Sequence, residues 1–226
     1  MPTPFTFINA AMSIDGKIST RQRHQVRISG DADFERMDEL RASSDAVMVG
    51  IGTVLADDPS LTVKSDERRS KRLEKGLDEN PVRIVVDSKA RIPKDADIFR
   101  KGAGKRIIAV SESAAFDRVR ALRENAMVIM AGKNQVDLPE LLSILGEMGI
   151  QRLMVEGGAG LNWGLVKNGL VDEIYSFIGN LIIGGSTAPT LIDGEGFDEA
   201  DIPACSLIGA EKMEGGVLLK WKLKNA

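Results

Sequence analysis

Residues 153–165 read L-M-V-E-G-G-A-G-L-N-W-G-L, and this stretch decides how the chain folds. A short apolar run ends at Val155, glycines follow directly after Glu156, and apolar residues then return at helical spacing. That order predicts a strand, a glycine turn and a helix, because glycine tolerates a sharp bend and a helix start leaves backbone N–H groups without partners. Phosphate suits such a helix start, although an ordinary strand-to-helix turn uses the same glycines.

Glu156 stands where the predicted strand gives way to the loop. In open α/β sheets, ligands bind beyond the carboxyl ends of the strands. We therefore expect the Glu156 carboxylate to face a ligand. The glycines that follow lack the full G-x-G-x-x-G spacing of a dinucleotide fingerprint, so the motif by itself does not name that ligand.

A second stretch repeats this device. Residues 46–49 form a predicted buried strand, and G-I-G-T-V-L at 50–55 opens a second helix with glycine. Asp57 and Asp58 precede Pro59, and proline biases the residue before it away from the helix, so the helix should stop there. Two adjacent acids in such a turn are usually only solvated; metal binding is the alternative, without further carboxylates nearby in the sequence.

Apolar and amphipathic segments alternate along the whole chain. The predicted strands are Phe5–Met12, 46–49, Val82–Val86, Arg106–Val110, Met127–Met130, 152–155, 171–178 and 216–223, and the predicted helices are 31–43, 114–124, 138–148 and 161–168. Strands separated by helices imply a mixed, mostly parallel, twisted α/β sheet with helices on both faces, and the late strands fit antiparallel additions. We expect one domain over residues 1–226.

The composition excludes several classes of protein. Of 226 residues, 43% are apolar and 28% are charged, and the formal net charge is −3, which gives no reason to expect nucleic-acid binding. No apolar run approaches the roughly 20 residues that cross a bilayer, and no signal peptide precedes the first strand, so we expect a cytoplasmic protein. Cys205 and His24 are each alone of their kind, which excludes an internal disulfide and a His/Cys metal site. An enzyme with so few acid–base groups relies on a borrowed cofactor.

The tail of the strand Val82–Val86 bears on the identity of a cofactor. An acidic residue at such a strand end suits the ribose hydroxyls of NAD, whereas serine and basic groups suit the 2′-phosphate of NADP. Asp87 therefore favours NAD, while Ser88, Lys89 and Arg91 favour NADP, and the balance leans to NADP. A solvated loop is the alternative.

Two polar features near the N-terminus have open interpretations. Asn9 is the strongly polar residue of the apolar segment Phe5–Met12, and a buried amide needs hydrogen-bond partners, which either the protein or a ligand can supply. The sequence S-I-D-G-K-I-S at 13–19 contains Asp-Gly, which predicts a turn. That turn belongs either to a hairpin or to a lid over a site.

Four segments occur together and in order. They are A-A-M-S-I-D-G-K-I-S at 10–19, V-G-I-G-T-V-L-A-D-D-P-S-L-T-V at 49–63, N-P-V-R-I-V-V-D-S at 80–88, and V-E-G-G-A-G-L-N-W-G-L at 155–165 with G-L-V-D-E at 169–173. This combination closely resembles the riboflavin-biosynthesis reductases of the dihydrofolate-reductase-like fold, and most of all their stand-alone archaeal branch. The resemblance covers nearly the whole chain. Bacterial relatives carry the domain behind a zinc deaminase, whose H-x-E and C-x-x-C patterns are missing from this sequence.

The resemblance implies NADPH-dependent reduction of 2,5-diamino-6-ribosylamino-4(3H)-pyrimidinone 5′-phosphate. The ribosylamino sugar opens to an imine-like form, hydride from NADPH reaches C1′, and a ribitylamino phosphate results. Such chemistry asks the protein mainly to position two ligands and exclude water, so no proton donor is identified. The alternatives are reduction of the deaminated 5-amino-6-ribosylaminouracil 5′-phosphate and a non-catalytic NADPH-binding module. Homodimers are also what the family implies.

The same resemblance assigns residues. By likeness, Thr53 and Asp57 hold the nicotinamide side of the cofactor. The residues beside its adenosine end are Val86, Asp87, Ser88 and Lys89. The residues that hold its pyrophosphate are Gly158, Ala159, Gly160, Leu161 and Asn162. The substrate positions are Asn9, Ser29, Arg41, Leu61, Lys64 and Glu156. Among these, Arg41 and Lys64 suit the phosphate. Many bacterial members have lysine where Asn9 stands, and a neutral donor and acceptor there suits the diaminopyrimidine. No metal is expected.

Overall fold

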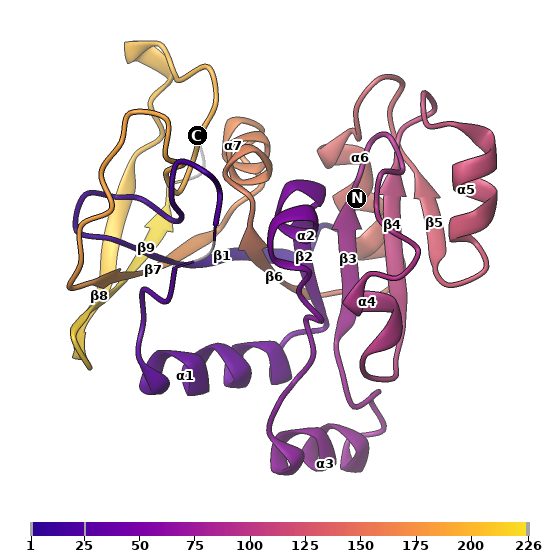
Figure 1. The fold of residues 1–226 in the computed structure, drawn as a ribbon, viewed down its shortest axis with the longest axis horizontal. Coiled ribbons are helices and arrows are strands. Elements are labelled where there is room, and N and C mark those ends of the chain that lie inside the picture. Colours follow the sequence, from indigo (N-terminus) through magenta and orange to yellow (C-terminus); the bar gives the residue numbers. More distant parts are fainter. Residues whose placement is uncertain (1, 25, 225–226) are drawn as a thin grey trace. The chain divides into compact units, whose positions relative to one another are not determined.

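The computed structural model describes residues 2–24 and 26–224 (Figure 1). The chain divides into two compact units. The first unit comprises residues 2–4 and Asp38–Met154, and the second comprises Phe5–Met37 and residues 155–224. Strand β6, Arg152–Gly157, begins in the first unit and ends in the second. Helix α1, Asp31–Ala42, begins in the second unit and ends in the first.

The first unit is a parallel sheet with its helices. Its strands lie in the order β5-β4-β3-β2, and in Figure 1 β3, β4 and β5 stand side by side with α5 beyond β5. The bounds are β2 Ala46–Gly50, β3 Val82–Val86, β4 Arg106–Val110, β5 Met127–Met130, α2 Ile51–Asp57, α3 Asp66–Glu74, α4 Asp97–Arg100, α5 Phe116–Leu122 and α6 Leu138–Glu147. Every residue of β2 is buried, so both faces of this strand are covered, as expected for a parallel sheet.

The second unit adds antiparallel pairing. Strand β1 pairs with β7 in parallel, β7 with β9 antiparallel, and β9 with β8 antiparallel, which makes β8 the outermost strand. The bounds are β1 Phe5–Met12, β7 Glu173–Gly179, β8 Cys205–Met213, β9 Gly216–Leu223, α7 Ala159–Lys167 and a short 3₁₀ helix at Glu199–Asp201. The predicted mixed, mostly parallel α/β sheet is confirmed.

Most predicted elements agree with the structure, and the differences have physical causes. Strands β1, β3, β4, β5 and β9 have the predicted bounds. Strand β6 continues two residues beyond its predicted end and includes Glu156 and Gly157, the second of which already has a positive φ. Strand β8 was not predicted, and most of its residues are exposed, so it lacks the apolar run that marks a buried strand.

The Asp-Gly turn at 13–17 forms, but not as a hairpin that returns along β1. The amide of Gly16 donates to the carbonyl of Ser13 at 2.9 Å, and Lys17 makes an isolated antiparallel bridge with Thr190. The hairpin alternative is therefore wrong, because the partner of this turn lies far along the chain. In the part of the chain that the structure describes, no helix is long and apolar enough to span a membrane.

Candidate functional site

The corner between β6 and α7 has the glycine geometry that the sequence suggested. Gly157 and Gly158 have φ values of +110° and +89°, a region that glycine enters without the steric cost of a Cβ. Helix α7 begins at Ala159, and its N-cap residue, Gly158, has no side chain with which to cap it. The start of an α-helix is where backbone N–H groups suit an anion. Glu156, just before this corner, is half-buried at the end of β6.

Asn162 holds a loop against the start of α7. Its side chain is fully buried, and its Nδ2 donates to the carbonyl of Leu191 at 2.8 Å. The amide of Asp193 donates to the carbonyl of Ala159 at 3.2 Å, so the segment around Leu191 lies directly on this helix start. The Oδ1 atom of Asn162 is buried and has no hydrogen-bond partner among the described residues. A buried acceptor without a donor is costly, so this atom fits a ligand that can donate.

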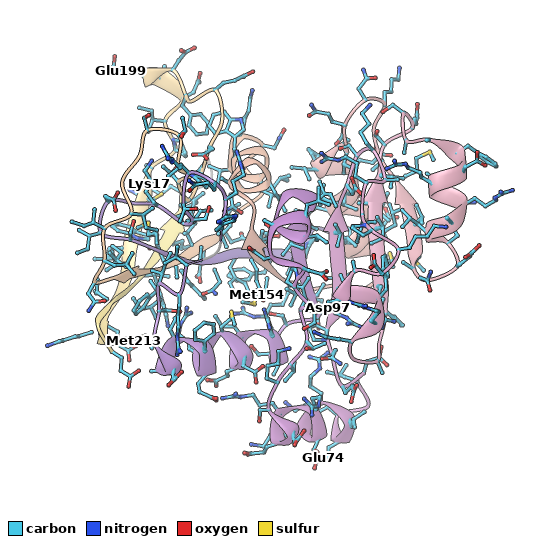
Figure 2. The ribbon with its side chains drawn as sticks, in the orientation of Figure 1. Lys17, Glu74, Asp97, Met154, Glu199 and Met213 are labelled. Carbon is cyan, nitrogen blue, oxygen red and sulfur yellow. The ribbon has the colours of Figure 1, made fainter. Side chains whose placement is uncertain are left out.

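The turn at 13–17 fixes the same loop from its other end. The Asp15 carboxylate accepts from Ile183 N at 3.1 Å and from Gly184 N at 2.7 Å, and Lys17 Nζ, labelled in Figure 2, donates to the carbonyl of Ala188 at 2.9 Å. A hydrogen bond from the Ser13 hydroxyl and those from the two amides lower the pKa of Asp15 to about 2. Asp15 thus stays ionised and keeps the loop in place. The Asp-Gly signal had pointed to this segment, but its partner could not be found from the sequence.

Asn9 on β1 is buried beneath α1. Its Oδ1 accepts from Arg36 Nη2 at 2.8 Å, and Arg36 donates in turn to the carboxylate of Asp33 from Nε at 2.9 Å and Nη2 at 2.7 Å. The open question over Asn9 is thus partly answered, because a protein side chain satisfies one of its two polar atoms. Ser29, which precedes α1, is also buried.

Arg41 and Lys64 come together around Thr62 in the first unit. Arg41 is 7% exposed and donates from Nη1 to the carbonyl of Thr62 at 3.0 Å. Lys64 Nζ donates to the hydroxyls of Thr62 and Ser60, both at 2.9 Å. Partial burial and the positive charges of Arg41 and Lys101 lower the pKa of Lys64. This concentration of positive charge suits an anion such as phosphate.

The backbone that carries Lys64 is held by residues that the sequence did not single out. Leu61 is 1% exposed and has φ +54°, which is unusual for a residue with a Cβ. Asp38 accepts from the backbone N of Lys64 at 2.5 Å, and Asn80 Oδ1 accepts from Val63 N at 2.8 Å. These buried side chains fix the segment 60–64. Asp38 lies in none of the quoted segments, and Asn80 begins the segment 80–88 without a role assigned to it, because each acts on residues distant in sequence.

The ends of β3 and β4 form a third group of polar residues. Lys89 Nζ donates to Ser113 Oγ at 2.7 Å, and Ser88 accepts from Ser111 Oγ through its carbonyl at 2.8 Å. Asp87 is fully buried and accepts from Ile92 N at 2.8 Å within its own turn. Asp87 therefore serves the loop conformation, while the serine hydroxyls and the Lys89 ammonium remain at the strand ends next to the half-buried Val86.

Helix α2 carries Thr53, which is half-buried, and ends at Asp57. Partial burial raises the pKa of the Asp57 carboxyl. The neighbouring Asp58 adopts φ +41° and accepts from Asp97 N at 2.8 Å, so it holds the start of α4. Within residues 2–24 and 26–224, no three His, Cys, Asp or Glu side chains come together as a metal site.

A mostly parallel α/β sheet with a glycine-opened helix start defines an open α/β fold, in which ligands bind beyond the carboxyl ends of the strands. The chain belongs to the RibD C-terminal domain family, which it matches over residues 4–219. The predicted membership of the riboflavin-biosynthesis reductases is thereby confirmed.

The chain is similar in sequence to two named relatives and in fold to one solved structure. It is 50% identical over 194 residues to the 2,5-diamino-6-ribosylamino-4(3H)-pyrimidinone 5′-phosphate reductase of Archaeoglobus fulgidus, covering 86% of this chain and 88% of the relative. The protein of the same name from Methanothermobacter thermautotrophicus is 49% identical over 196 residues, covering 87% of each chain. The structure of Acinetobacter baumannii RibD has a TM-score of 0.81 at 22% identity and covers 98% of this chain. This chain spans 58% of that protein, whose similarity concerns the fold alone.

Proposed function

We propose that the protein is an NADPH-dependent reductase of 2,5-diamino-6-ribosylamino-4(3H)-pyrimidinone 5′-phosphate that forms the ribitylamino product. The observation that carries this proposal is the 50% identity, over 86% of the chain, to the archaeal relative named for this reductase. Because one fold hosts many activities, the proposal also rests on the side chains that can hold the two ligands.

The residues present fit NADPH. The start of α7, with Gly158, Ala159, Gly160, Leu161 and Asn162, offers backbone N–H groups for the pyrophosphate, and the glycine φ values leave the backbone open to close approach. We assign the adenosine end to Val86, Asp87, Ser88 and Lys89, and the nicotinamide side to Thr53 and Asp57. When bound, NADPH supplies the hydride that reduces the opened sugar.

The protein's own groups bind and orient the substrate. Arg41 and Lys64 hold its phosphate, the first as a fork of N–H donors and the second as a point charge. Glu156 accepts hydrogen bonds from the sugar or the base, and we assign Asn9, Ser29 and Leu61 to the substrate on the family resemblance. The residues described contribute position and exclusion of water, and none of them is assigned as the proton donor.

The direct test is turnover by the purified protein with NADPH and the diaminopyrimidinone phosphate. We expect loss of NADPH absorbance and a product two hydrogens heavier in the mass spectrum. The deaminated phosphate is the comparison substrate, since the chain is also 36% identical to a Bacillus amyloliquefaciens protein of the bacterial RibD type. Faster turnover of the deaminated compound would reverse the substrate assignment, and turnover of neither would reject the reductase proposal.

The variant Glu156→Gln tests the substrate role within the same assay. It keeps the shape of the side chain but replaces an acceptor oxygen by an N–H donor. We expect kcat/KM for the substrate to fall about tenfold or more while the NADPH Kd stays unchanged. Glu199→Gln is the matched control, because Glu199 is exposed in the 3₁₀ helix of the second unit (Figure 2). Equal losses for both ligands would remove Glu156 from the substrate site.

We further propose a cytoplasmic homodimer that uses the edge strand β8. Leu207 and Ile208 on this strand are 52% and 49% exposed, and an exposed apolar edge strand invites pairing with a second copy. Sedimentation should give the mass of a dimer, and Ile208→Glu should shift it toward the monomer. A wild-type monomer at micromolar concentration would reject this proposal. Cytoplasmic location fits the phosphorylated substrate and cofactor.

A further inference from the structure

Three side chains of the second unit, two from α1 and one from β1, are linked by hydrogen bonds. Asp33 and Arg36 lie one turn apart on the helix, and Asn9 faces them from β1. The side chains of Arg36 and Asp33 are only 15% and 8% exposed, and their ion pair measures 2.7 Å. Arg36 Nη2 reaches Asn9 Oδ1 at 2.8 Å. Because both ends of this chain are buried, Arg36 has little freedom to leave Asn9.

The chemistry of the guanidinium fixes which way the Asn9 amide points. A guanidinium has five N–H donors and no acceptor, so the Asn9 atom that faces it must be the carbonyl oxygen. One lone pair of the Asn9 carbonyl oxygen is thereby taken up by the protein. The Nδ2 amide, which can only donate, is the atom of Asn9 that Arg36 leaves to a ligand.

The groups around Asn9 also favour a ligand that accepts a hydrogen bond from it. Phe7, two residues earlier on the same face of β1, is fully buried, and its ring lies 5.1 Å from that of Tyr175, the register partner of Asn9. Arg36 Nη1 is buried and has no hydrogen-bond partner within the described residues. The surroundings of Asn9 are therefore rich in hydrogen-bond donors and short of acceptors, which suits a ligand group that accepts.

We infer that Arg36 is a positioning residue that makes Asn9 a hydrogen-bond donor, so that this position recognises an acceptor, such as a ring carbonyl, on the pyrimidine. The inference rests on the proposed function, which places Asn9 at the substrate. It narrows the expectation from the sequence, in which Asn9 offered both a donor and an acceptor. A ring carbonyl occurs in both candidate substrates, so this contact recognises a pyrimidinone as such and leaves the choice between the two to other residues.

A double-mutant cycle tests whether Arg36 acts through Asn9. The variants are Arg36→Gln, Asn9→Ala and the double variant, and the readouts are kcat/KM for the diaminopyrimidinone phosphate and the NADPH Kd. We expect each single change to lower kcat/KM about tenfold, the double variant to be no worse than Asn9→Ala within about twofold, and NADPH binding to be unchanged. Multiplying losses, or an equal loss of NADPH affinity, would overturn the inference, because a structural role alone would produce them.

Asn9→Asp tests the donor directly. Aspartate has nearly the same shape and can still accept from Arg36, but it has no N–H to offer. We expect it to lose as much kcat/KM as Asn9→Ala, whereas activity near that of the wild type would overturn the donor role. Arg27→Gln is the control, because Arg27 pairs with Asp31 at the start of the same helix with its side chain 64% exposed, and no loss is expected.

Two further measurements keep the test decisive. If Arg36→Gln does not fold, as judged by circular dichroism, Asp33→Asn replaces it in the cycle, since Asp33 orients Arg36 and should give the same non-additive pattern. Calorimetric binding of the substrate phosphate repeats the cycle without turnover. Turnover of neither phosphate by the wild type would reject the proposed function, whereas wild-type turnover with multiplying losses would reject only the role of Arg36.

Discussion

The ammonium of Lys89 donates to the hydroxyl of Ser113 at 2.7 Å, which links the ends of the parallel strands β3 and β4. Lys89 is exposed, and among the residues that the structure describes it forms no ion pair with a carboxylate. Arg91, two residues on, lies 3.6 Å from a carboxylate oxygen of Asp87. The charge of Lys89 therefore remains available to a phosphate.

We predict that Lys89→Ala narrows the preference for NADPH over NADH about tenfold, because one charge-assisted contact to the 2′-phosphate is lost. Arg91→Ala should have a smaller effect, since the Asp87 carboxylate, 3.6 Å from Arg91 Nε, offsets part of the Arg91 charge. The ratio of kcat/KM values for the two cofactors measures this preference. Lys94→Ala, an exposed lysine of the same loop, is the control. An unchanged ratio in Lys89→Ala would contradict the assignment.

The lowered pKa of Lys64 predicts an alkaline loss of substrate capture. Burial and the charges of Arg41 and Lys101 favour the neutral amine, so Lys64 loses its proton below the ordinary lysine value of 10.5. Since the free enzyme's ionisations appear in kcat/KM, this parameter should fall as the pH rises toward that value. Lys64→Arg keeps its charge throughout and should remove the decline. The same decline in both proteins would rule out Lys64 as its source.

Gly158→Ala should weaken NADPH binding and reduce stability. At φ +89° an added Cβ costs about 1–2 kcal/mol, and relief of that strain would move the start of α7. Fluorescence titration should show an NADPH Kd raised about tenfold. The control is Gly169→Ala, because Gly169 has φ +65° beyond the other end of α7. Gly169→Ala should lower the free energy of unfolding without changing the NADPH Kd. An equal rise in the NADPH Kd of both variants would contradict a role of the helix start in cofactor binding.

Arg83→Met should destabilise the fold by about 3 kcal/mol or more. Arg83 is fully buried on β3 and donates to the carbonyls of Lys101, Gly102 and Ala103 at 2.6, 3.0 and 3.1 Å. Burial lowers its pKa to about 10. Methionine fills the space but takes its donors away from all three carbonyls, of which those of Gly102 and Ala103 keep one other donor each, from Arg106 and Asn80. The free energy of unfolding in urea measures the change.

Arg100→Met is the control for this substitution, because the Arg100 side chain is 60% exposed in its pair with Asp97. We expect its free energy of unfolding to change by about 0.5 kcal/mol or less. A similar small change in Arg83→Met would mean that water replaces the lost donors, and that the buried guanidinium is not a fixed point of the fold.

We predict that residues 1–226 unfold as one domain, since β6 contributes residues to both compact units. Trp163 and Trp221, the two tryptophans of the chain, lie in the second unit, so their fluorescence follows that unit, whereas far-ultraviolet circular dichroism follows both. The two signals should change at the same urea concentration. Separate midpoints would show that the units unfold independently.

Burial made part of the fold predictable. Strands β3 and β4 were predicted with their observed bounds because parallel strands under helices leave continuous apolar runs in the sequence. Strand β8 was not predictable in this way, because most of its residues are exposed. Helix α4 was not predictable either, because its four residues are too few to show a helical period.

The candidate site was predictable where function depends on local backbone. The glycines at 157 and 158 were recognisable because only glycine adopts those φ values readily. Asp38 and Asn80 were not, because each meets its partner in the segment 60–64 across 17 or more residues. The roles assigned to individual ligand-binding residues stay predictions.

By itself, the sequence determined the order of strands and helices, the two glycine-opened helix starts and the family, because these depend on periodicity and on residues close together along the chain. Only the tertiary structure decided which polar groups are already satisfied. Arg36 holds the oxygen of Asn9 from 27 residues away, and Asp15 holds Gly184 from 169 residues away. Hydrogen bonds of this kind depend on where packing brings distant segments together, and no local pattern in the sequence records it.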